Sequence, residues 1–348
     1  MAKLLEITGK AISGEWGQDD DTGTGIPVLR TTNFTNEGFV NYKNVVTRSI
    51  SKKNIAEKYL RHGDVIIEKS GGSDKQPVGR VIFFEGEENK YLFNNFTGLL
   101  RVQNPEEWLP KYVFYALYAY YRNGGTRAFE NRTTGLHNLQ VDNYVKSVDI
   151  PKLSYRKQQH ICETLDHVRD AVAYRERQLT KLDELIKARF VEMFGDPYTN
   201  SKDYPLKKGE SFFKLSNGKA VPESKRLNGG IPAYGGNGIS WYTDESLFDA
   251  DTIVVGRVGF QSGNVHLVKG PLWVTDNAMY MSSCDFSQYN LTFLIELMAH
   301  VDFTKFQDAG DLKKITQKPF MQFEYLCPPL SLQNQFAAFV AEVDKSKV

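Results

Sequence analysis

The chain has 348 residues, with 43 Lys and Arg against 42 Asp and Glu, so its formal net charge is +1. This balance excludes a protein that attracts polyanions through net charge alone, and any nucleic-acid surface must come from local clustering. The three cysteines, Cys162, Cys284 and Cys327, share no ligand spacing, which argues against a disulfide framework or structural zinc and indicates reduced thiols in a cytoplasmic protein. No segment reaches the ~18 apolar residues that span a bilayer, and the first ten residues lack a signal-peptide pattern.

Short strands alternate with polar, Gly-rich loops in both halves of the chain. The strands predicted are Val65–Glu68, Arg80–Phe84, Ile253–Gly256 and Val265–Val268, with helices at Lys111–Tyr121 and Leu291–His300. The regular β-α alternation of a doubly wound sheet is missing, so the pattern predicts an α+β fold.

A long helix is predicted between the halves, at Lys157–Phe194. Ser154 is a suitable N-cap, and Gly195 followed by Pro197 ends the helix. Its apolar positions follow the 3.5-residue spacing of a coiled coil, which indicates a two-helix spacer. This seam consists of Ile161, Leu165, Val168, Val172, Leu179, Leu182, Ile186 and Met193.

A second, shorter seam begins after Leu330, at Phe336, Val340 and Val343, and the sequence stops at Val348. A seam as long as the first needs a partner helix of similar length. We therefore expect either a truncated second helix or a helix from another chain, including self-association, to cover the first one.

The sequence also repeats itself, which predicts two tandem copies of one domain, each followed by a helix. At an offset of 177 residues, Leu153-Ser154 with Gln158 matches Leu330-Ser331 with Gln335, Phe129 matches Phe306, and the stretch from Gly135 to Val148 matches that from Leu312 to Tyr325. Looser matches join Ile26-Pro27 to Ile231-Pro232, residues 63–67 to residues 250–254, and Asn94-Asn95 to Asp276-Asn277.

Two stretches of the first copy have the composition of a DNA-contacting surface. Residues 122–157 carry seven Lys or Arg against three acids, and residues 70–75 combine paired glycines, hydroxyls and a lysine. Such residues suit phosphate and base-edge contacts, although a solvated basic face and a plain hairpin loop explain them equally well. In the second copy Asn237 or Arg257 could reach a base, and Lys313 and Lys314 a phosphate.

Several of these motifs, in this order, resemble the specificity subunit of type I restriction-modification systems. They are Gly63-Asp64-Val65-Ile66-Ile67 followed by Ser70-Gly71-Gly72 and Gly79-Arg80-Val81, then Gly135-Leu136-His137-Asn138-Leu139, Ile150-Pro151 with Gln158-Gln159, and Ala188 to Pro197 at the end of the long helix. The resemblance covers essentially the whole chain.

The resemblance implies two target-recognition domains, at 1–153 and 196–329, a spacer helix at 154–195 and the start of a second, truncated spacer helix at 330–348. Such a subunit is not catalytic, needs no cofactor or metal, reads a bipartite, gapped DNA target, and docks methyltransferase and restriction subunits. The candidate DNA-binding residues are Ser70, Gly71, Gly72, Lys75, Arg80, Arg127, Arg132, His137, Asn138, Asn237, Arg257, Lys313 and Lys314.

Two other classes remain open from the residues alone. A coiled-coil interaction protein that binds other proteins would show no steep salt dependence toward DNA. A carboxylate-lysine metal nuclease could be built from Asp64, Glu88 and Lys90. Neither a methyltransferase box nor a Walker loop is present, and a metal site at His160, Glu163 and His167 is disfavoured because these residues flank the seam.

Overall fold

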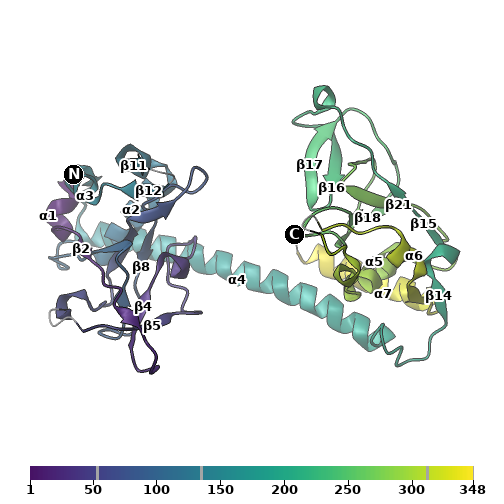
Figure 1. Ribbon diagram of the computed structural model, residues 1–348, viewed down its shortest axis with the longest axis horizontal. Coiled ribbons are helices and arrows are strands. Elements are labelled where there is room, and N and C mark those ends of the chain that lie inside the picture. The colour runs from purple at the N-terminus through teal and green to yellow at the C-terminus, as the bar shows by residue number, and fades with distance from the viewer. Residues whose placement is uncertain (52–54, 134–135, 311–312, 348) are drawn as a thin grey trace. The chain divides into compact units, whose positions relative to one another are not determined.

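A computed structural model describes residues 1–51, 55–133, 136–310 and 313–347 of the chain. The chain divides into two compact units, Met1–Val172 and Ala173–Val348. Both contain sheets and helices, which confirms the predicted α+β class, and Figure 1 shows helix α4 as one uninterrupted element.

The first unit contains thirteen short strands in the described part of the chain, arranged in four small sheets of order β1-β13, β2-β10-β6-β8, β3-β5-β4-β9 and β11-β12-β7. The strands are β1 (Ala2–Lys3), β2 (Ile12–Ser13), β3 (Gln18–Asp19), β4 (Ile26–Leu29), β5 (Val46–Ser49), β6 (Val65–Glu68), β7 (Ser70–Gly72), β8 (Val81–Phe83), β9 (Leu92–Phe93), β10 (Thr97–Leu100), β11 (Glu130–Thr133), β12 (Leu136–Leu139) and β13 (Asp149–Ile150). The helices are α1 (Leu4–Thr8), α2 (Pro110–Arg122), α3 (Val141–Ser147) and the first part of α4 (Tyr155–Phe194), with 3₁₀ turns η1 (Thr31–Asn33), η2 (Ala56–Lys58) and η3 (Gly125–Phe129).

The central strand β6 is buried on both faces, which is why it reads as a continuous apolar run. Val65 and Ile67 point into a core formed with α2, whereas Ile66 points into a second core with Phe84 and Leu99. Successive side chains of a strand point to opposite faces, so one strand supplies both cores. Helix α2 packs against β8 and starts with Pro110, whose missing N–H is not needed at the first helical position.

The second unit repeats this arrangement with sheets of order β14-β22, β15-β21-β18-β19 and β17-β16-β20. Its strands are β14 (Leu206–Lys208), β15 (Phe213–Asn217), β16 (Ile231–Gly235), β17 (Gly238–Thr243), β18 (Thr252–Gly256), β19 (Val265–Val268), β20 (Trp273–Val274), β21 (Ala278–Cys284) and β22 (Glu324–Leu326). Its helices are α5 (Leu291–His300), α6 (Lys318–Gln322) and α7 (Leu330–Lys345), with 3₁₀ turns η4 (Gly209–Ser211), η5 (Glu223–Lys225) and η6 (Phe303–Phe306).

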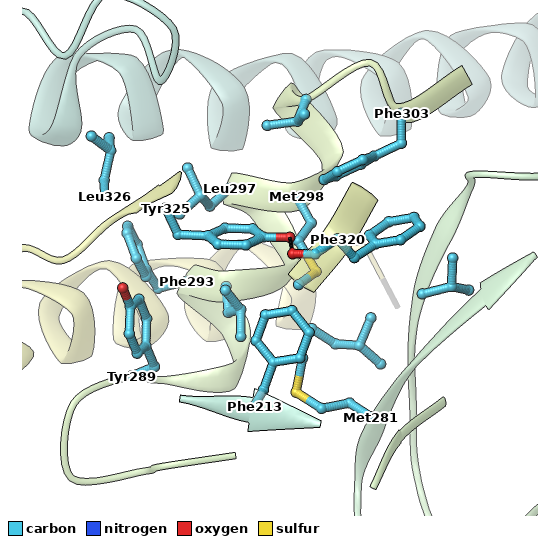
Figure 2. Packing of buried hydrophobic residues seen from close by; sticks show 14 of the residues in the cluster. Phe213, Met281, Tyr289, Phe293, Leu297, Met298, Phe303, Phe320, Tyr325 and Leu326 are labelled. Atoms are coloured by element: carbon cyan, nitrogen blue, oxygen red, sulfur yellow. Dashed lines mark hydrogen bonds between the residues drawn. The ribbon is translucent and has the colours of Figure 1, made fainter. Parts of the chain in front are cut away.

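Aromatic side chains fill the core of the second unit (Figure 2). Phe303 stacks on Phe320 with ring centroids 4.0 Å apart, and Phe213 meets Tyr325 edge to face at 5.7 Å. The buried Tyr325 hydroxyl donates to the carbonyl of Phe320 at 3.0 Å, so its polar end is satisfied. Asn290 caps α5 by accepting from the backbone N–H of Thr292, which fixes the helix start at the predicted Leu291.

The two units share most of their topology, although in the described part of the second unit the sheet β11-β12-β7 is reduced to a single bridge and β3 has no counterpart. The sheet β2-β10-β6-β8 corresponds strand for strand to β15-β21-β18-β19, and both units contain a parallel pair, β4 with β9 and β16 with β20. A glycine follows the first strand of each sheet at equivalent places. A Cβ on Gly14 would lie 2.1 Å from the carbonyl oxygen of Asn94, and a Cβ on Gly218 would lie 2.1 Å from that of Thr275. The two units therefore require glycine for the same close approach.

Equivalent hydrogen bonds correct the alignment of the two copies near their ends. Gln158 is fully buried and bonds the backbone of Glu107, Leu109 and Leu153. Gln333, not the exposed Gln335, makes the same three bonds in the second unit. The offset between the copies is 177 residues at Phe129 and Phe306, but 175 at Gln158 and Gln333. The difference arises because α6, the counterpart of α3, has two residues fewer.

The upstream matches shift by one residue in the same way. The N–H of Lys69 donates to the carbonyl of Phe96, and the N–H of Arg257 donates to that of Asn277. These bonds align residues 63–67 with 251–255 rather than 250–254. They also align Asn94 with Thr275 rather than Asp276. A slip of one residue exchanges the faces of a strand, so this correction decides which side chains are equivalent.

Helix α4 begins at Tyr155, two residues before the predicted start, and ends at Phe194. Gly195 has a φ of 76° and donates to the carbonyl of Val191, as expected of a glycine after a helix. The predicted seam is buried unevenly. In the first unit Ile161 is half-buried, while Leu165, Val168 and Val172 are 39, 57 and 53% exposed; in the second unit Leu179, Leu182 and Met193 are half-buried and Ile186 is buried.

Within the second unit, α7 packs against the end of α4. Phe336, Val340 and Val343 join Ile186, Phe190 and Phe194 in the core of that unit. The ring of Phe190 lies 5.6 Å from that of Phe336, edge to face. The burial of Phe190 and Phe194 shows that this part of α4 uses aromatic positions the predicted seam left out.

Candidate nucleic-acid interface

The sheet β11-β12-β7 brings together most of the residues predicted to contact DNA in the first unit. His137 pairs with Gly72, and Asn138 pairs with Ser70 and Asn131. Residues separated by more than 60 positions in the sequence therefore lie side by side. Arg132 is on β11 in this sheet, but its side chain lies outside the described part of the chain, as do Thr134 and Gly135.

A tight turn follows β7 and presents Lys75 to solvent. The N–H of Ser73 donates to the carbonyl of Gln76 at 2.7 Å, and the N–H of Gln76 donates to the Ser73 hydroxyl at 3.1 Å. Arg127 donates to the carbonyl of Asp74 at 3.2 Å, so the turn is also held from η3. The turn thus holds an exposed cation on a fixed backbone.

Cations and phenols from four segments line a cavity of about 300 Å³ beside this turn. Tyr118 donates to the carbonyl of Asn36 at 2.7 Å, and Tyr121 donates to that of Pro77 at 3.3 Å. Burial raises the pKa of both phenols, so they stay protonated at neutral pH. The lining residues that could contact an anion are Lys75, Arg80, Arg122, Arg127, Tyr118 and Tyr121.

Arg80 lies deepest in this group and is already paired. Its guanidinium makes two bonds to the buried Glu68 carboxylate, at 3.0 and 2.9 Å. Burial lowers the pKa of Arg80, but the hydrogen bonds and attraction to Glu68 outweigh it and raise the pKa overall. Arg80 therefore stays charged and mainly stabilises the wall of the cavity, which makes it less available to phosphate than Lys75.

His137 and the glycines of β7 also have structural roles. His137 is 8% exposed, and its Nδ1 lies 3.3 Å from the Glu130 carboxylate. A Cβ on Gly72 would lie 2.4 Å from the backbone nitrogen of Val78, and Gly71 has a φ of 121°. The packing of the loop thus accounts for both glycines, and Asn138, which is half-buried, is the side chain on β12 best placed to reach a base.

The second unit gathers its predicted residues at the equivalent edge. Val258 pairs with Lys314, and the N–H of Gly259 donates to the carbonyl of Lys313 at 2.8 Å. Asn237 is exposed in the two-residue turn between β16 and β17. This turn packs closely on the end of β18. A Cβ added to Gly236 would lie only 3.1 Å from the Cα of Gly256. Arg257 follows Gly256 directly, so all four predicted residues of this unit converge.

One substitution between the copies makes the two edges different. By the corrected alignment Gly256 stands where the first unit has Glu68. A carboxylate at that place binds Arg80 in the first unit, whereas a glycine lets the turn at Gly236 approach in the second. The two units therefore have the same scaffold but present different side chains.

Tyr118 and Tyr121 of the cavity wall were not predicted from the sequence, although their spacing with Arg122 places all three on one face of α2. Phe260, which is 92% exposed beside Gly259, was not predicted either. An exposed aromatic side chain has no sequence signal that separates it from a core residue.

The nuclease alternative is wrong for the proposed residues. Asp64 is 2% exposed, and Arg101 holds both of its oxygens at 2.7 and 2.6 Å. Lys90 pairs with Glu87 at 2.7 Å, and Glu88 accepts from the backbone N–H of His62. Among the described residues, no group of three or more His, Cys, Asp or Glu side chains could hold a metal ion, and no helix is long and apolar enough to cross a membrane.

Solved structures show that this is the fold of type I restriction-modification specificity subunits. The specificity subunit of M. genitalium has a TM-score of 0.63 at 15% identity, over 99% of this chain and 89% of that one. A chain from a study of complex assembly and conformational transition of the type I system has a TM-score of 0.54 at 12% identity, over 99% of this chain and 90% of that one.

Curated sequences point the same way. The chain is 23% identical over 120 residues to a protein of Haemophilus influenzae named as a type I restriction enzyme specificity subunit, covering 34% of this chain and 31% of the relative. It is 23% identical over 113 residues to the EcoprrI specificity subunit of Escherichia coli, covering 32% of this chain and 28% of that protein. No protein-family model matches the chain. The matched region spans about a third of these curated relatives, and the resemblance noted in the sequence is confirmed.

Proposed function

We propose that this protein is the DNA sequence-specificity subunit of a type I restriction-modification complex, and that it carries no catalytic activity of its own. The observation that supports this most is the pair of equivalent edges. In each unit, strands and turns distant in sequence bring amides together with lysines and arginines on a fixed backbone. Cations suit phosphates and amides suit base edges, so each edge has the two kinds of group that DNA reading needs.

In this proposal the first unit reads one half of a bipartite, gapped target and the second unit reads the other. The exchange of Glu68 for Gly256 supports two different half-sites, because it changes which side chains each edge presents. The target is then asymmetric rather than palindromic.

The proposal includes docking of methyltransferase and restriction subunits, which carry the chemistry. Exposed apolar side chains on α4, at Leu165, Val168 and Val172, support binding of another chain at this helix. A modification subunit or a second copy of this chain would cover them, since apolar side chains in a row on a helix favour a partner surface.

Selection from random-sequence duplexes, followed by fluorescence anisotropy at several salt concentrations, tests the DNA-reading role. We expect one gapped sequence to be enriched and log K to fall steeply with log salt, by about 0.9 per phosphate contact. Lys75→Ala and Arg127→Ala should each lower that slope by about one and weaken all sequences alike.

Lys90→Ala is the matched control, because Lys90 is an exposed lysine of the same unit that is paired with Glu87 and does not line the cavity. Its slope should equal that of the unmodified chain. A flat salt dependence without sequence enrichment would instead support the protein-binding alternative.

A further inference from the structure

Phe260 occupies an unusual place for a large apolar side chain. It is 92% exposed, the highest value among the exposed large hydrophobic residues of the described chain. It lies in the loop that joins β18 to β19, next to Gly259, whose φ is 96°. A ring with this exposure contributes almost no buried area to the core of this unit, so it is free to contact a partner.

The backbone that carries Phe260 is firmly held. Gly256 donates to the carbonyl of Asn264 at 2.9 Å, and Gly263 donates back to that of Gly256 at 2.8 Å. The side chain of Gln307 donates to the carbonyl of Ser262 at 2.6 Å. The ring is therefore displayed from a braced loop whose backbone is fixed on both sides of it.

The groups around this loop are those of the candidate DNA edge. The N–H of Gly259, the preceding residue, donates to the carbonyl of Lys313, while Val258 pairs with Lys314. Arg257 is three positions before the ring, and its guanidinium donates to the carbonyl of Asp276 at 3.3 Å. Two lysines and an arginine thus belong to the backbone segments that adjoin the loop of Phe260.

The alignment of the two copies shows which residue of the first unit is equivalent to Phe260. Equivalent backbone bonds match Lys69 with Arg257, and hence Gly71 with Gly259 and Gly72 with Phe260. Gly71 and Gly259 both have positive φ, at 121° and 96°, which supports this match. In the first unit the chain continues from Gly72 into the turn that presents Lys75. Phe260 therefore stands at the start of the segment that carries the exposed cation in the other copy.

We propose that Phe260 is an apolar wedge that inserts against the bases of the DNA bound by the second unit and partly unstacks one base step. Proteins that read DNA use phenylalanine in this way, and the cations beside it would hold the phosphates on either side of the opened step. The proposal rests on the proposed DNA-reading function and adds a specific role for one residue.

The experiment uses the full chain and the duplex recovered by selection, with 2-aminopurine placed at successive positions of each half-site. Binding should raise the fluorescence of the probe at one step of a single half-site, because unstacking removes its quenching. Phe260→Ala should abolish this rise and weaken binding about tenfold or more. Phe260→Trp should restore both, since a tryptophan ring can stack in the same place.

Phe286→Ala is the matched control. Phe286 is 59% exposed in the same unit and follows the end of β21 at Cys284, whereas Ala278 at the other end of that strand pairs with Gly256. The length of β21 puts about 20 Å between the two places. Phe286→Ala should leave affinity and probe fluorescence unchanged.

The possible results distinguish failure of the wedge proposal from failure of the proposed DNA-reading function. If the unmodified chain enriches no duplex and binds none, both proposals are overturned. If it binds a selected duplex and Phe260→Ala binds it equally well with the same probe fluorescence, the wedge alone is overturned. If Phe260→Ala binds the duplex normally but no longer binds a modification subunit, the wedge proposal is also overturned, and the ring is assigned to a protein contact.

Discussion

At the scale of single residues, buried carboxylates decide which arginines are free. Glu68 and Asp64 are 1 and 2% exposed, and each is held by two bonds from one arginine, Arg80 and Arg101. A buried charge without its partner is costly, so these arginines are fixed by the fold. The candidate site therefore depends on cations whose partners are weaker or exposed, such as Lys75.

Arg101→Ala should strongly destabilise the first unit. The change leaves the Asp64 carboxylate buried without its partner and also removes bonds to the carbonyls of Glu57 and Tyr59. We expect a loss of about 3–5 kcal/mol. Hydrogen exchange of β6 peptides in a urea series measures the unfolding of this unit separately.

Lys90→Ala removes an exposed ion pair of the same unit, whose side chains are 47 and 69% exposed. Its effect should stay below about 1 kcal/mol. Equal urea midpoints for the two variants would contradict the importance assigned to the Asp64 pair.

Which cations serve the site could not be predicted from the sequence. The basic stretch is visible in the sequence, but Glu68 lies twelve residues before Arg80, and Glu130 is separated from its contact His137 by a hairpin. No helical or strand periodicity in the sequence indicates either pair, because each forms only when the strands that carry the two residues come together in the folded chain. Lys75 and Asn237 were identifiable because a turn exposes its side chains regardless of the rest of the fold.

At the scale of elements, two buried glutamines hold the start of each C-terminal helix to its unit. Gln158 at the start of α4 and Gln333 at the start of α7 each accept one backbone N–H and donate to two carbonyls. Each amide thus satisfies three buried backbone groups at once, which explains why the same residue type occupies both places.

Gln333→Ala should therefore destabilise the second unit by about 2–4 kcal/mol, since it leaves the N–H of Asn290 and two carbonyls without partners. Thermal unfolding followed by hydrogen exchange of α5 peptides measures the effect. Gln335→Ala is the control, because Gln335 is exposed on the same helix. If Gln335→Ala destabilised the second unit more than Gln333→Ala, the match of Gln158 to Gln335 predicted from the sequence would be correct.

Some elements were predictable to the residue. Strands β6 and β19 and helix α5 have the predicted bounds, since polar residues lie just outside both ends of the two strands and just before the helix. Strands β8 and β18 and helix α2 differ from the predicted bounds by one residue at one or both ends. The parallel pairs β4–β9 and β16–β20 were not foreseen, since β9 and β20 are only two residues long. Such strands carry no pattern, and only the surrounding core defines them.

At the scale of the whole molecule, the duplicated topology predicts that each unit controls its own half of the target. Asn138→Ala in the first unit and Asn237→Ala in the second each remove one candidate base-reading amide, although the two residues stand at different places in the shared fold. Each should relax one half-site and leave the other unchanged, with a loss of discrimination of roughly 5- to 150-fold, corresponding to about 1–3 kcal/mol.

Mapping methylated bases in cells that contain the matching methyltransferase subunit measures this directly. The unmodified chain should produce one bipartite, gapped motif that is absent without it, and each variant should broaden a different half. A palindromic motif would show that one unit reads both halves. Broadening of the same half by both variants would contradict the assignment of one half-site to each unit.

The first and last strands of each duplicated unit are partners. Ala2 pairs with Ile150 in β1 and β13, and Leu206 pairs with Leu326 in β14 and β22. The chain thus enters and leaves each unit at the same place, so that one pair of strands closes the unit. We expect a pair of crossovers, one in each end strand, to exchange a whole unit without disturbing the long helix, so that a new half-specificity is acquired in one exchange.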